Sequence, residues 1–167
     1  MKTNVKDTAT GNLMPALISE AGYGDMPLKK DGWNFNWRQL YRKEGDGMFF
    51  KLTLENTPEK AEGMVKLTLT EFGMLVLDCI EVAPSNYGRK GKYDLVAACL
   101  LAYSCLMSTK YGKNEYQSYL SFESKTVLIE LYIKKYGATQ AWGQKMYFSP
   151  EAGNKLINNY LYGNEKA

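Results

Sequence analysis

A short basic segment at residues 86–92 holds the side chains and glycines best suited to bind a ligand. It directly follows an apolar segment and leads into a helical pattern. A glycine-bearing loop at the start of a helix presents free backbone N–H groups at the positive end of the helix dipole, which favours phosphate. The segment is neither a Walker A nor a GxGxxG sequence. It predicts an anion-binding loop, with an exposed basic turn as the alternative. Its members are Asn86, Tyr87, Gly88, Arg89, Lys90, Gly91 and Lys92.

Glu81 is a second chemical candidate because it is a carboxylate within a largely apolar strand pattern, residues 74–82. Strand alternation places it on the same sheet face as Cys79. A buried carboxylate there could act as a general base and take a proton from an amine, directly or through water. The alternative is a carboxylate at the sheet edge, paired with a lysine or an arginine. Asp78 alternates onto the opposite face and is the weaker candidate.

Three large aromatic residues, Trp33, Phe35 and Trp37, alternate with asparagines and give a period-two pattern. Aromatic side chains with polar neighbours often line the pocket for an acceptor. The alternative, a place in the hydrophobic core, is the more common one for such residues. The sequence leaves both interpretations open.

The composition indicates one ordinary globular domain and excludes several kinds of site. The chain has 167 residues, 45% hydrophobic and 23% charged, so we expect a single domain over residues 1–167. Its formal net charge of +3 is too small to imply a nucleic-acid or membrane partner. Histidine is absent, which excludes Ser-His and Cys-His nucleophilic sites, HExxH zinc sites and an imidazole base. We expect no metal.

The cysteines and the apolar runs favour a cytoplasmic protein. Cys79, Cys99 and Cys105 lack CxxC spacing and lie in apolar segments, so we expect reduced core thiols. The longest apolar run, residues 95–103, is far shorter than the ~18–20 residues that span a bilayer. The beginning of the chain does not resemble a signal peptide.

Hydrophobic periodicity and turn residues divide the chain into elements. Residues 1–31 are rich in glycine, proline and turn pairs, so we expect a loop-rich segment packed on the main body. Expected strands lie at residues 48–54, 63–70, 74–82, 119–122, 140–143 and 144–148. Expected helices lie at residues 93–110, 125–136 and 150–161, and residues 38–43 could begin a short one. Ser124 and Ser149 are the expected N-caps, with Gly137 ending the middle helix.

The order of these elements predicts an α/β (α+β) fold with a mixed, mostly antiparallel central sheet flanked by helices. The strand at 74–82, the helix and the strand at 119–122 form a βαβ unit, so these two strands should be a parallel pair.

The passage IEVAPSNYGRKGK at residues 80–92 resembles the strand-4 to helix-3 passage of the GNAT N-acetyltransferase superfamily, V-x-P-x-x-R/Q-x-x-G-x-G/A. Residues 121–125, 131–132 and 136–138 resemble strand 5 and helix 4 of that family, which typically ends in LYEKLGF. The resemblance covers about residues 48–150. The chain departs from the motif where Tyr87 stands in place of Arg or Gln, and where the glycine after Gly88 comes one residue late.

The resemblance implies a GNAT-like fold and an acyl donor, acetyl-CoA. The end of the strand at 74–82 would pair its backbone with the pantetheine arm, and residues 86–92 would hold the pyrophosphate. The resemblance also implies that acetyl-CoA would contact Val82, Ala83, Ser124 and Lys125. Tyr132 would be the general acid that returns a proton to the CoA thiolate, a role that suits a phenol. The alternative for Tyr132 is a half-buried side chain packed beside Leu128 and Leu131.

We therefore predict an N-acetyltransferase that transfers an acetyl group from acetyl-CoA to a small-molecule or peptide amine, with Tyr132 and Glu81 as catalytic residues. The alternative is a catalytically silent GNAT-fold module that binds a ligand or a protein. A nucleic-acid binder that uses the basic segment ranks last, and we expect neither nucleic acid nor membrane as a partner. A homodimer is left open.

Overall fold

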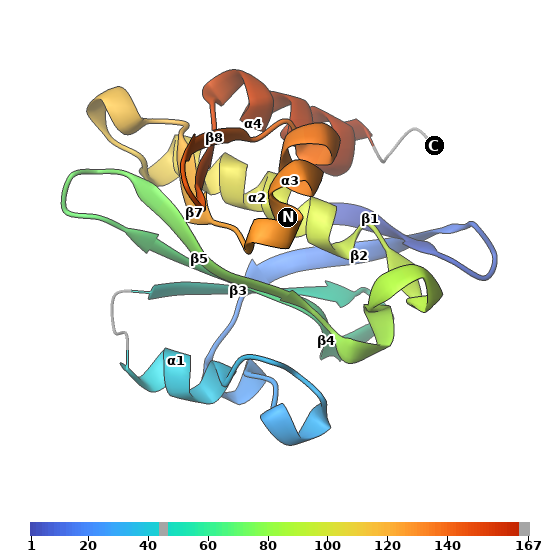
Figure 1. Cartoon of the computed structure of the whole chain (residues 1–167). Helices are drawn as coiled ribbons and strands as arrows, with labels where there is room; N and C mark the ends of the chain where they lie inside the picture. The colour runs from blue at the N-terminus through green and yellow to red at the C-terminus, as the bar shows by residue number, and fades with distance from the viewer. Residues whose placement is uncertain (44–46, 164–167) are drawn as a thin grey trace.

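One nine-stranded sheet forms the centre of the computed structural model, which describes residues 1–43 and 47–163 (Figure 1). The order of the strands across it is β6-β1-β2-β3-β4-β5-β7-β9-β8. All neighbours are antiparallel except β5 and β7, which are parallel, as the sequence predicted. The strands are β1 (Lys2–Asp7), β2 (Leu13–Glu20), β3 (Gly47–Leu54), β4 (Thr57–Leu69), β5 (Leu75–Val82), β6 (Tyr93–Asp94), β7 (Leu120–Glu123), β8 (Thr139–Trp142) and β9 (Lys145–Phe148).

The prediction of a loop-rich segment at residues 1–31 was wrong, because β1 and β2 form a hairpin that extends the sheet. Their buried side chains, Thr3, Val5, Ala16 and Ile18, do alternate. Thr3 is polar, however, and Pro15 interrupts the second strand. The alternation of buried and exposed residues could therefore not be recognised in the sequence. Pro15 lies where β2 has not yet paired with β3, since that register begins at Ala16 opposite Leu54. A missing N–H is tolerated at such a place.

Helices cover both faces of the sheet (Figure 1). The helices α2 (Val96–Tyr111), α3 (Ile129–Tyr136) and α4 (Pro150–Ile157) lie on one face and α1 (Trp37–Lys43) lies on the other. The larger core joins α2 and α4 to the sheet, and a second core beneath the sheet contains Trp33, Trp37, Phe49 and Met64. Short 3-10 turns lie at Tyr23–Asp25, Lys29–Asp31, Pro84–Asn86, Gly88–Lys90, Asn114–Tyr116 and Thr126–Leu128, and α4 continues as a π-helical turn at Asn158–Tyr162.

Gly63 allows α2 to lie close to the sheet. A Cβ at this position would come within 2.7 Å of Val96 Cγ1 and 2.8 Å of Leu100 Cδ1. These distances are shorter than normal van der Waals contact, so a larger residue would push the first turns of α2 away. The start of α2 thus sits directly above the end of β5, which pairs with β4 opposite Gly63.

A bulge in β5 separates its two halves. The β4–β5 register shifts between Lys66 and Leu67, so that Leu67 faces Leu77 while Lys66 faces Cys79. Asp78 is the extra residue, and a bulge of this kind bends and twists its strand. Beyond it, Cys79 contacts the core beneath the sheet, whereas Leu77 before it is buried on the α2 face. The alternation predicted for Cys79 and Glu81 therefore holds after the bulge.

The parallel pairing of β5 with β7 covers only Leu75 to Leu77 on β5, opposite Leu120 to Phe122 on β7. After this point β5 continues to Val82, but β7 ends at Glu123. The two strands separate beyond the bulge, and the sheet is open between them.

Some of the predicted helix caps are present in the structure and others are not. Ser149 Oγ accepts a hydrogen bond from Ala152 N–H and Pro150 begins α4, as predicted, while Gly137 ends α3 at φ 77°. The prediction of Ser124 as an N-cap was wrong, because its hydroxyl donates to Lys125 C=O at 2.9 Å and a 3-10 turn precedes α3. Residues 93–94, expected to be helical, pair with β1 instead.

Candidate active site

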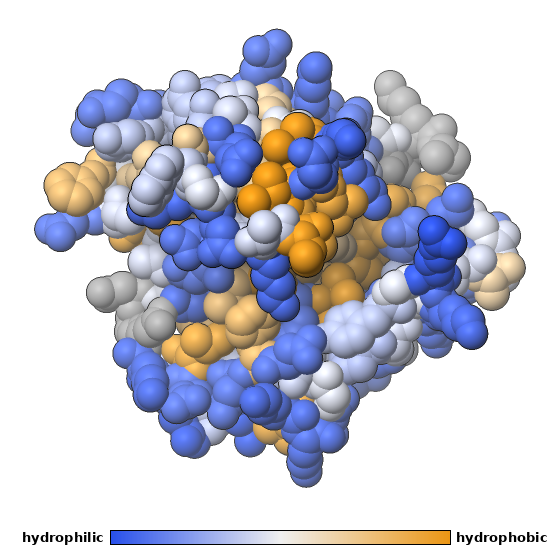
Figure 2. Space-filling view, in the orientation of Figure 1, coloured by the Kyte–Doolittle hydropathy of each residue, from blue (hydrophilic) through white to orange (hydrophobic). Residues whose placement is uncertain are grey.

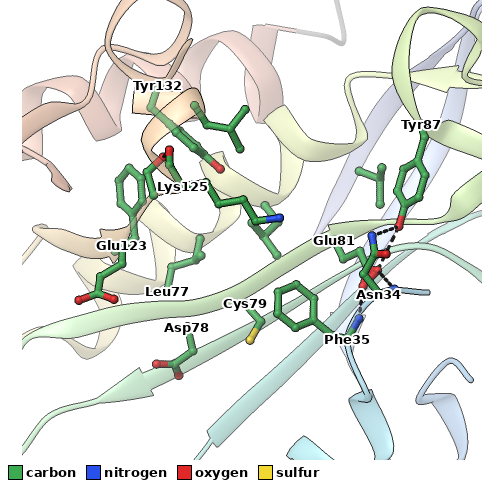
Figure 3. Close-up of a pocket in the computed structure, with 15 residues that line it drawn as sticks. Asn34, Phe35, Leu77, Asp78, Cys79, Glu81, Tyr87, Glu123, Lys125 and Tyr132 are labelled. Atoms are coloured by element: carbon green, nitrogen blue, oxygen red, sulfur yellow. Dashed lines mark hydrogen bonds between the residues drawn. The ribbon is translucent and has the colours of Figure 1, made fainter. Parts of the chain in front are cut away.

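A cavity of about 430 Å³ fills the opening between β5 and β7 (Figure 3). Residues 77–82 of β5 form its floor, and residues 122–125 at the end of β7 form a second side. Tyr132 on α3 lines it from one face of the sheet, and Phe35, which precedes α1, lines it from the other. Figure 2 shows hydrophobic side chains in the hollow of the face that it presents, with mostly hydrophilic residues around them.

The open edge of β5 offers backbone groups to this cavity. Ala83 N–H donates to Glu62 C=O on the β4 side at 2.8 Å, and Ala83 C=O accepts from Asn86 N–H. Successive residues of a strand direct their backbone groups to opposite sides. The N–H and C=O groups of Ile80 and Val82 are therefore directed away from β4, toward the opening. Val82 lines the cavity as the resemblance implies, whereas both backbone groups of Ala83 are already bonded.

Tyr132 lines the cavity with its ring half-buried against Phe122, at 4.9 Å between ring centroids, and Tyr136, at 6.0 Å. Burial, and to a lesser degree the neighbouring Tyr136, raises the pKa of Tyr132 above its ordinary value. Its phenol is therefore protonated at neutral pH and able to donate a proton. Among the described residues, none is hydrogen-bonded to its hydroxyl, so a ligand in the cavity can use it.

Glu81 is buried at 7% exposure and accepts four hydrogen bonds (Figure 3). Its Oε2 accepts from Asn34 N–H at 2.7 Å and Tyr87 O–H at 3.1 Å. Its Oε1 accepts from Phe35 N–H at 3.0 Å and from the indole N–H of Trp37 at 3.3 Å. A carboxylate has about four lone-pair sites, and all are used here.

Tyr87 belongs to the basic segment and joins it to this carboxylate. Burial first, then the charge of Glu81 and the hydrogen bond to it, raises the pKa of Tyr87 to about 12. Its hydroxyl also accepts from the side-chain amide of Asn34 at 3.1 Å. Tyr87 stays a neutral donor at any ordinary pH and fixes one end of the loop beside the cavity.

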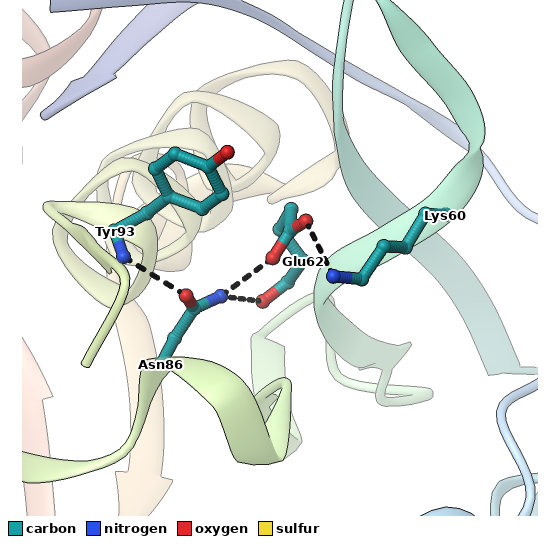
Figure 4. A network of polar contacts seen from close by, with 4 residues as sticks. All are labelled: Lys60, Glu62, Asn86 and Tyr93. Carbon is teal, nitrogen blue, oxygen red and sulfur yellow. Dashed lines mark hydrogen bonds and ion pairs between the residues drawn. The ribbon is translucent and has the colours of Figure 1, made fainter. Parts of the chain in front are cut away.

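Much of the backbone of residues 86–92 is engaged internally, unlike the open cradle that the sequence predicted. The N–H groups of Asn86, Tyr87, Gly91 and Lys92 donate to carbonyl groups of the same region. Asn86, predicted to bind phosphate, is buried. Its amide donates to Glu62 Oε2 at 2.8 Å and to Glu62 C=O at 3.2 Å, and it accepts from Tyr93 N–H at 3.0 Å (Figure 4). Asn86 holds the loop in shape.

Four cations lie on the loop and at the end of β7, and of these Lys125 is the one that lines the cavity. Arg89, Lys90 and Lys92 are exposed on the loop, and Lys125 extends into the cavity from the end of β7 (Figure 3). Gly88 has a φ of 64°, and apart from its chain neighbours no atom of the described residues lies within 4 Å of where its Cβ would be, so the chain can be approached closely there. Ser124 lines the cavity too, but its backbone N–H donates to Gln144 and its hydroxyl to Lys125. An anion would therefore be bound mainly by lysine and arginine side chains.

None of the three cysteines, all in the described part of the chain, forms a disulfide, and two of them, Cys99 and Cys105, are core residues. Burial raises the pKa of Cys99 to about 11 and that of Cys105 to about 12, which makes both poor nucleophiles. Cys79 is half-buried and lines the cavity next to the bulge, where the sequence predicted a core thiol. In the part of the chain that the structure describes, no group of three or more acidic or cysteine side chains could hold a metal ion. No helix there is long and apolar enough to span a membrane.

The backbone is similar to several solved structures, two of which are acetyltransferases. One is AtaTR bound with AcCoA, 16% identical, which matches over 85% of this chain and 98% of the other with a TM-score of 0.59. Another is the spermidine/spermine N-acetyltransferase SpeG from Vibrio cholerae, 11% identical over 86% and 97% of the two chains, also with a TM-score of 0.59. A third is a GNAT family acetyltransferase from Elizabethkingia anophelis with acetyl-CoA bound, 18% identical over 76% and 78%, with a TM-score of 0.53.

The chain has the GNAT fold. The predicted fold class is thereby confirmed, including its one parallel strand pair. No family model and no curated protein matches the sequence itself. A further solved structure shows the AtaT–AtaR complex with DNA.

Within this GNAT fold, the structure brings together Tyr132, Glu81, Val82, Tyr87, Ser124 and Lys125, all of which line the cavity. It places Ala83, Asn86 and residues 88–92 outside the lining, and Ala83 and Asn86 are engaged internally. Sequence analysis missed Asn34, whose backbone and side chain both contact the Glu81–Tyr87 pair. It also missed Glu62, which Asn86 contacts. Neither residue carries a local signal, because both contacts join segments far apart in the chain.

Proposed function

We propose that this protein transfers an acetyl group from acetyl-CoA to an amine. The observation that carries the proposal is the opening between β5 and β7. There a free strand edge, at Ile80 and Val82, and an unbonded phenol, at Tyr132, face the same cavity. The GNAT fold and the acetyl-CoA in structures with that fold support the assignment.

The residues present fit the acyl donor. The strand edge can pair with the two amides of a pantetheine arm, as one strand pairs with another. The diphosphate can be held by Arg89, Lys90, Lys92 and Lys125 and by the first-turn N–H groups of α2. Because several loop amides are already bonded, we propose that side-chain cations contribute more here than backbone amides do.

Acetyl-CoA supplies a thioester, and in the reaction a C–N bond to the amine forms while the C–S bond breaks. Backbone N–H groups at the edge of β5 polarise the carbonyl that is attacked. Tyr132 then donates its phenolic proton to the departing sulfur. The amine also loses a proton, and the contacts of Glu81 favour water as its acceptor, since all lone-pair sites of that carboxylate are occupied.

The acceptor enters from the face that Phe35 lines, opposite Tyr132. We propose a small-molecule or peptide amine. The DNA in the AtaT–AtaR structure does not fit our expectation that nucleic acid is not a partner, and that expectation is unconfirmed. The cytoplasmic location and a homodimer stay predictions.

A catalytically silent binding module is the second candidate function. The specific observation that favours it is the internally bonded loop, in which the N–H groups of Asn86, Tyr87, Gly91 and Lys92 are not free for a diphosphate. Such a module would bind a ligand in the same cavity without turning it over.

Calorimetric titration with acetyl-CoA, followed by a colorimetric assay of free CoA thiol with a panel of amines, tests both candidates. We expect binding and amine-dependent release of CoA. Saturation at 100 times Kd should stabilise the fold by about 2.7 kcal/mol. Binding without release for any amine would support the silent module. Absence of binding at millimolar acetyl-CoA would refute the transferase.

A further inference from the structure

The Glu81 carboxylate connects three segments that are distant in sequence. It lies on β5, its partners Asn34, Phe35 and Trp37 precede or begin α1, and its partner Tyr87 lies on the loop before α2 (Figure 3). Asn34 closes the ring of contacts because its side-chain amide donates to Tyr87 Oη at 3.1 Å. The wall of the cavity on the Phe35 side is thereby linked to the basic loop through one side chain.

This arrangement does not suit a general base. A base must accept a new proton at one oxygen, and here that would displace one of the four donors. Two of those donors are backbone N–H groups, which would be left without a partner at a partly buried place. The arrangement does suit a carboxylate that holds other groups in position.

The segment that Glu81 holds is irregular. Residues 33–36 lie between a 3-10 turn and α1 and belong to no helix or strand. The side chains of Trp33 and Trp37 anchor its two ends in the core beneath the sheet, while Phe35 is 39% exposed at the cavity. The bonds from Asn34 and Phe35 N–H to Glu81 thus fix the middle of the segment, and with it the position of Phe35.

We propose that Glu81 is a positioning residue, which ties the wall at residues 34–37 to Tyr87 so that a ligand bound at the basic loop steadies that wall of the cavity. The link to the ligand rests on the proposed function. A ligand bound at the loop limits the motion of the Tyr87 side chain, which in turn limits the motion of the Glu81 carboxylate. The carboxylate then holds the backbone amides of Asn34 and Phe35 in place. The binding of the donor would then prepare the side from which the acceptor enters.

Hydrogen exchange followed by NMR tests the tie without any ligand. In the wild-type protein we expect the amides of Asn34 and Phe35 to be protected by about a hundredfold or more, although they lie in an irregular segment. Unprotected amides would overturn the proposal. In Glu81→Gln, which has only one acceptor oxygen, we expect about tenfold faster exchange at one or both amides and an upfield shift of the Trp37 indole proton.

Glu123→Gln is the matched control for Glu81→Gln, since it removes an exposed carboxylate from the same cavity. It should leave the exchange of residues 34–37 unchanged, and an equal effect of both variants would refute the specific role of Glu81. Amides of β4 serve as a measure of global stability. If Glu81→Gln does not fold, the wild-type protection and the Tyr87→Phe variant below still decide the question.

Exchange in the presence of acetyl-CoA tests the link. Wild-type protein with bound acetyl-CoA should show at least about threefold slower exchange at Asn34 and Phe35. Tyr87→Phe, which keeps the other three bonds to Glu81, should show near wild-type exchange without ligand but no slowing with it. If titration shows binding and the wild-type exchange does not change, the link is wrong and the transferase proposal stands. If titration shows no binding, the transferase proposal and the link fail, and the ligand-free arm still decides whether Glu81 holds the wall.

Discussion

Asn86→Ala should destabilise the protein strongly, because the Asn86 side chain hydrogen-bonds the loop beside the cavity to Glu62 and to Tyr93 (Figure 4). The substitution removes the donor from Glu62 Oε2, at 2.8 Å, and the acceptor from Tyr93 N–H, at 3.0 Å. Glu62 is only 1% exposed, so water cannot readily replace the lost donor. A buried N–H without a partner costs about 1–3 kcal/mol, and a lost hydrogen bond to a charged group about 1.5–3 kcal/mol. The expected loss of unfolding free energy is therefore about 2.5–6 kcal/mol.

Equilibrium unfolding in urea measures this loss. With a slope of about 2 kcal/mol per molar for a protein of this size, the midpoint should fall by about 2 M. Ser85→Ala is the matched control, since Ser85 is exposed on the same loop and its backbone C=O still accepts from Lys92 N–H. It should change stability by less than about 0.5 kcal/mol. A loss of under about 1 kcal/mol in Asn86→Ala would show that the network does not hold the loop.

Three further predictions concern the cavity and its supports. Tyr132→Phe should lower kcat for CoA release about a hundredfold or more while leaving the Kd for acetyl-CoA nearly unchanged, and equal turnover of the two proteins would remove Tyr132 from the mechanism. Since burial raises the pKa of Tyr132 and only the protonated phenol donates, wild-type kcat should fall with rising pH only above the ordinary pKa of a tyrosine, and Tyr132→Phe should lack this limb. Gly63→Ala should lower the unfolding free energy by about 1–3 kcal/mol, because its Cβ would meet Val96 and Leu100, and an unchanged urea midpoint would contradict this packing.

The sequence was sufficient for the parts of the fold that depend on local patterns. Runs of apolar residues marked β3, β4 and β5, and a serine–proline pair marked the start of α4. Residues 1–31 were misjudged because β1 and β2 are stabilised by pairing with each other and with β3, not by a strong pattern of their own. The strand with which a given strand pairs can lie far away in the sequence, so no short stretch of residues reveals it.

Part of the candidate site followed from the resemblance to the GNAT family. Tyr132 and Val82 were expected at the acyl-donor site, and both line the cavity. Asn86 was expected to bind phosphate, but the amide that could do so is taken up by Glu62, in a segment that looks polar and exposed in the sequence. The role of Glu81 was equally hard to predict from the sequence, because its hydrogen-bond partners lie up to 47 positions away in the chain. A polar residue in a pattern can be identified from sequence, but its partner cannot.

The parallel pairing of β5 with β7 has a consequence for how the protein is made. The strands from β1 to β5 form a meander that can assemble while the chain emerges from the ribosome, since each strand joins its predecessor. The cavity cannot exist until α2 and β7 have followed, because β7 is its second side. A nascent chain that stops short of residue 120 would contain six of the nine strands and would lack the second side of the cavity. The capacity to bind is thus acquired late in synthesis, after most of the scaffold has formed.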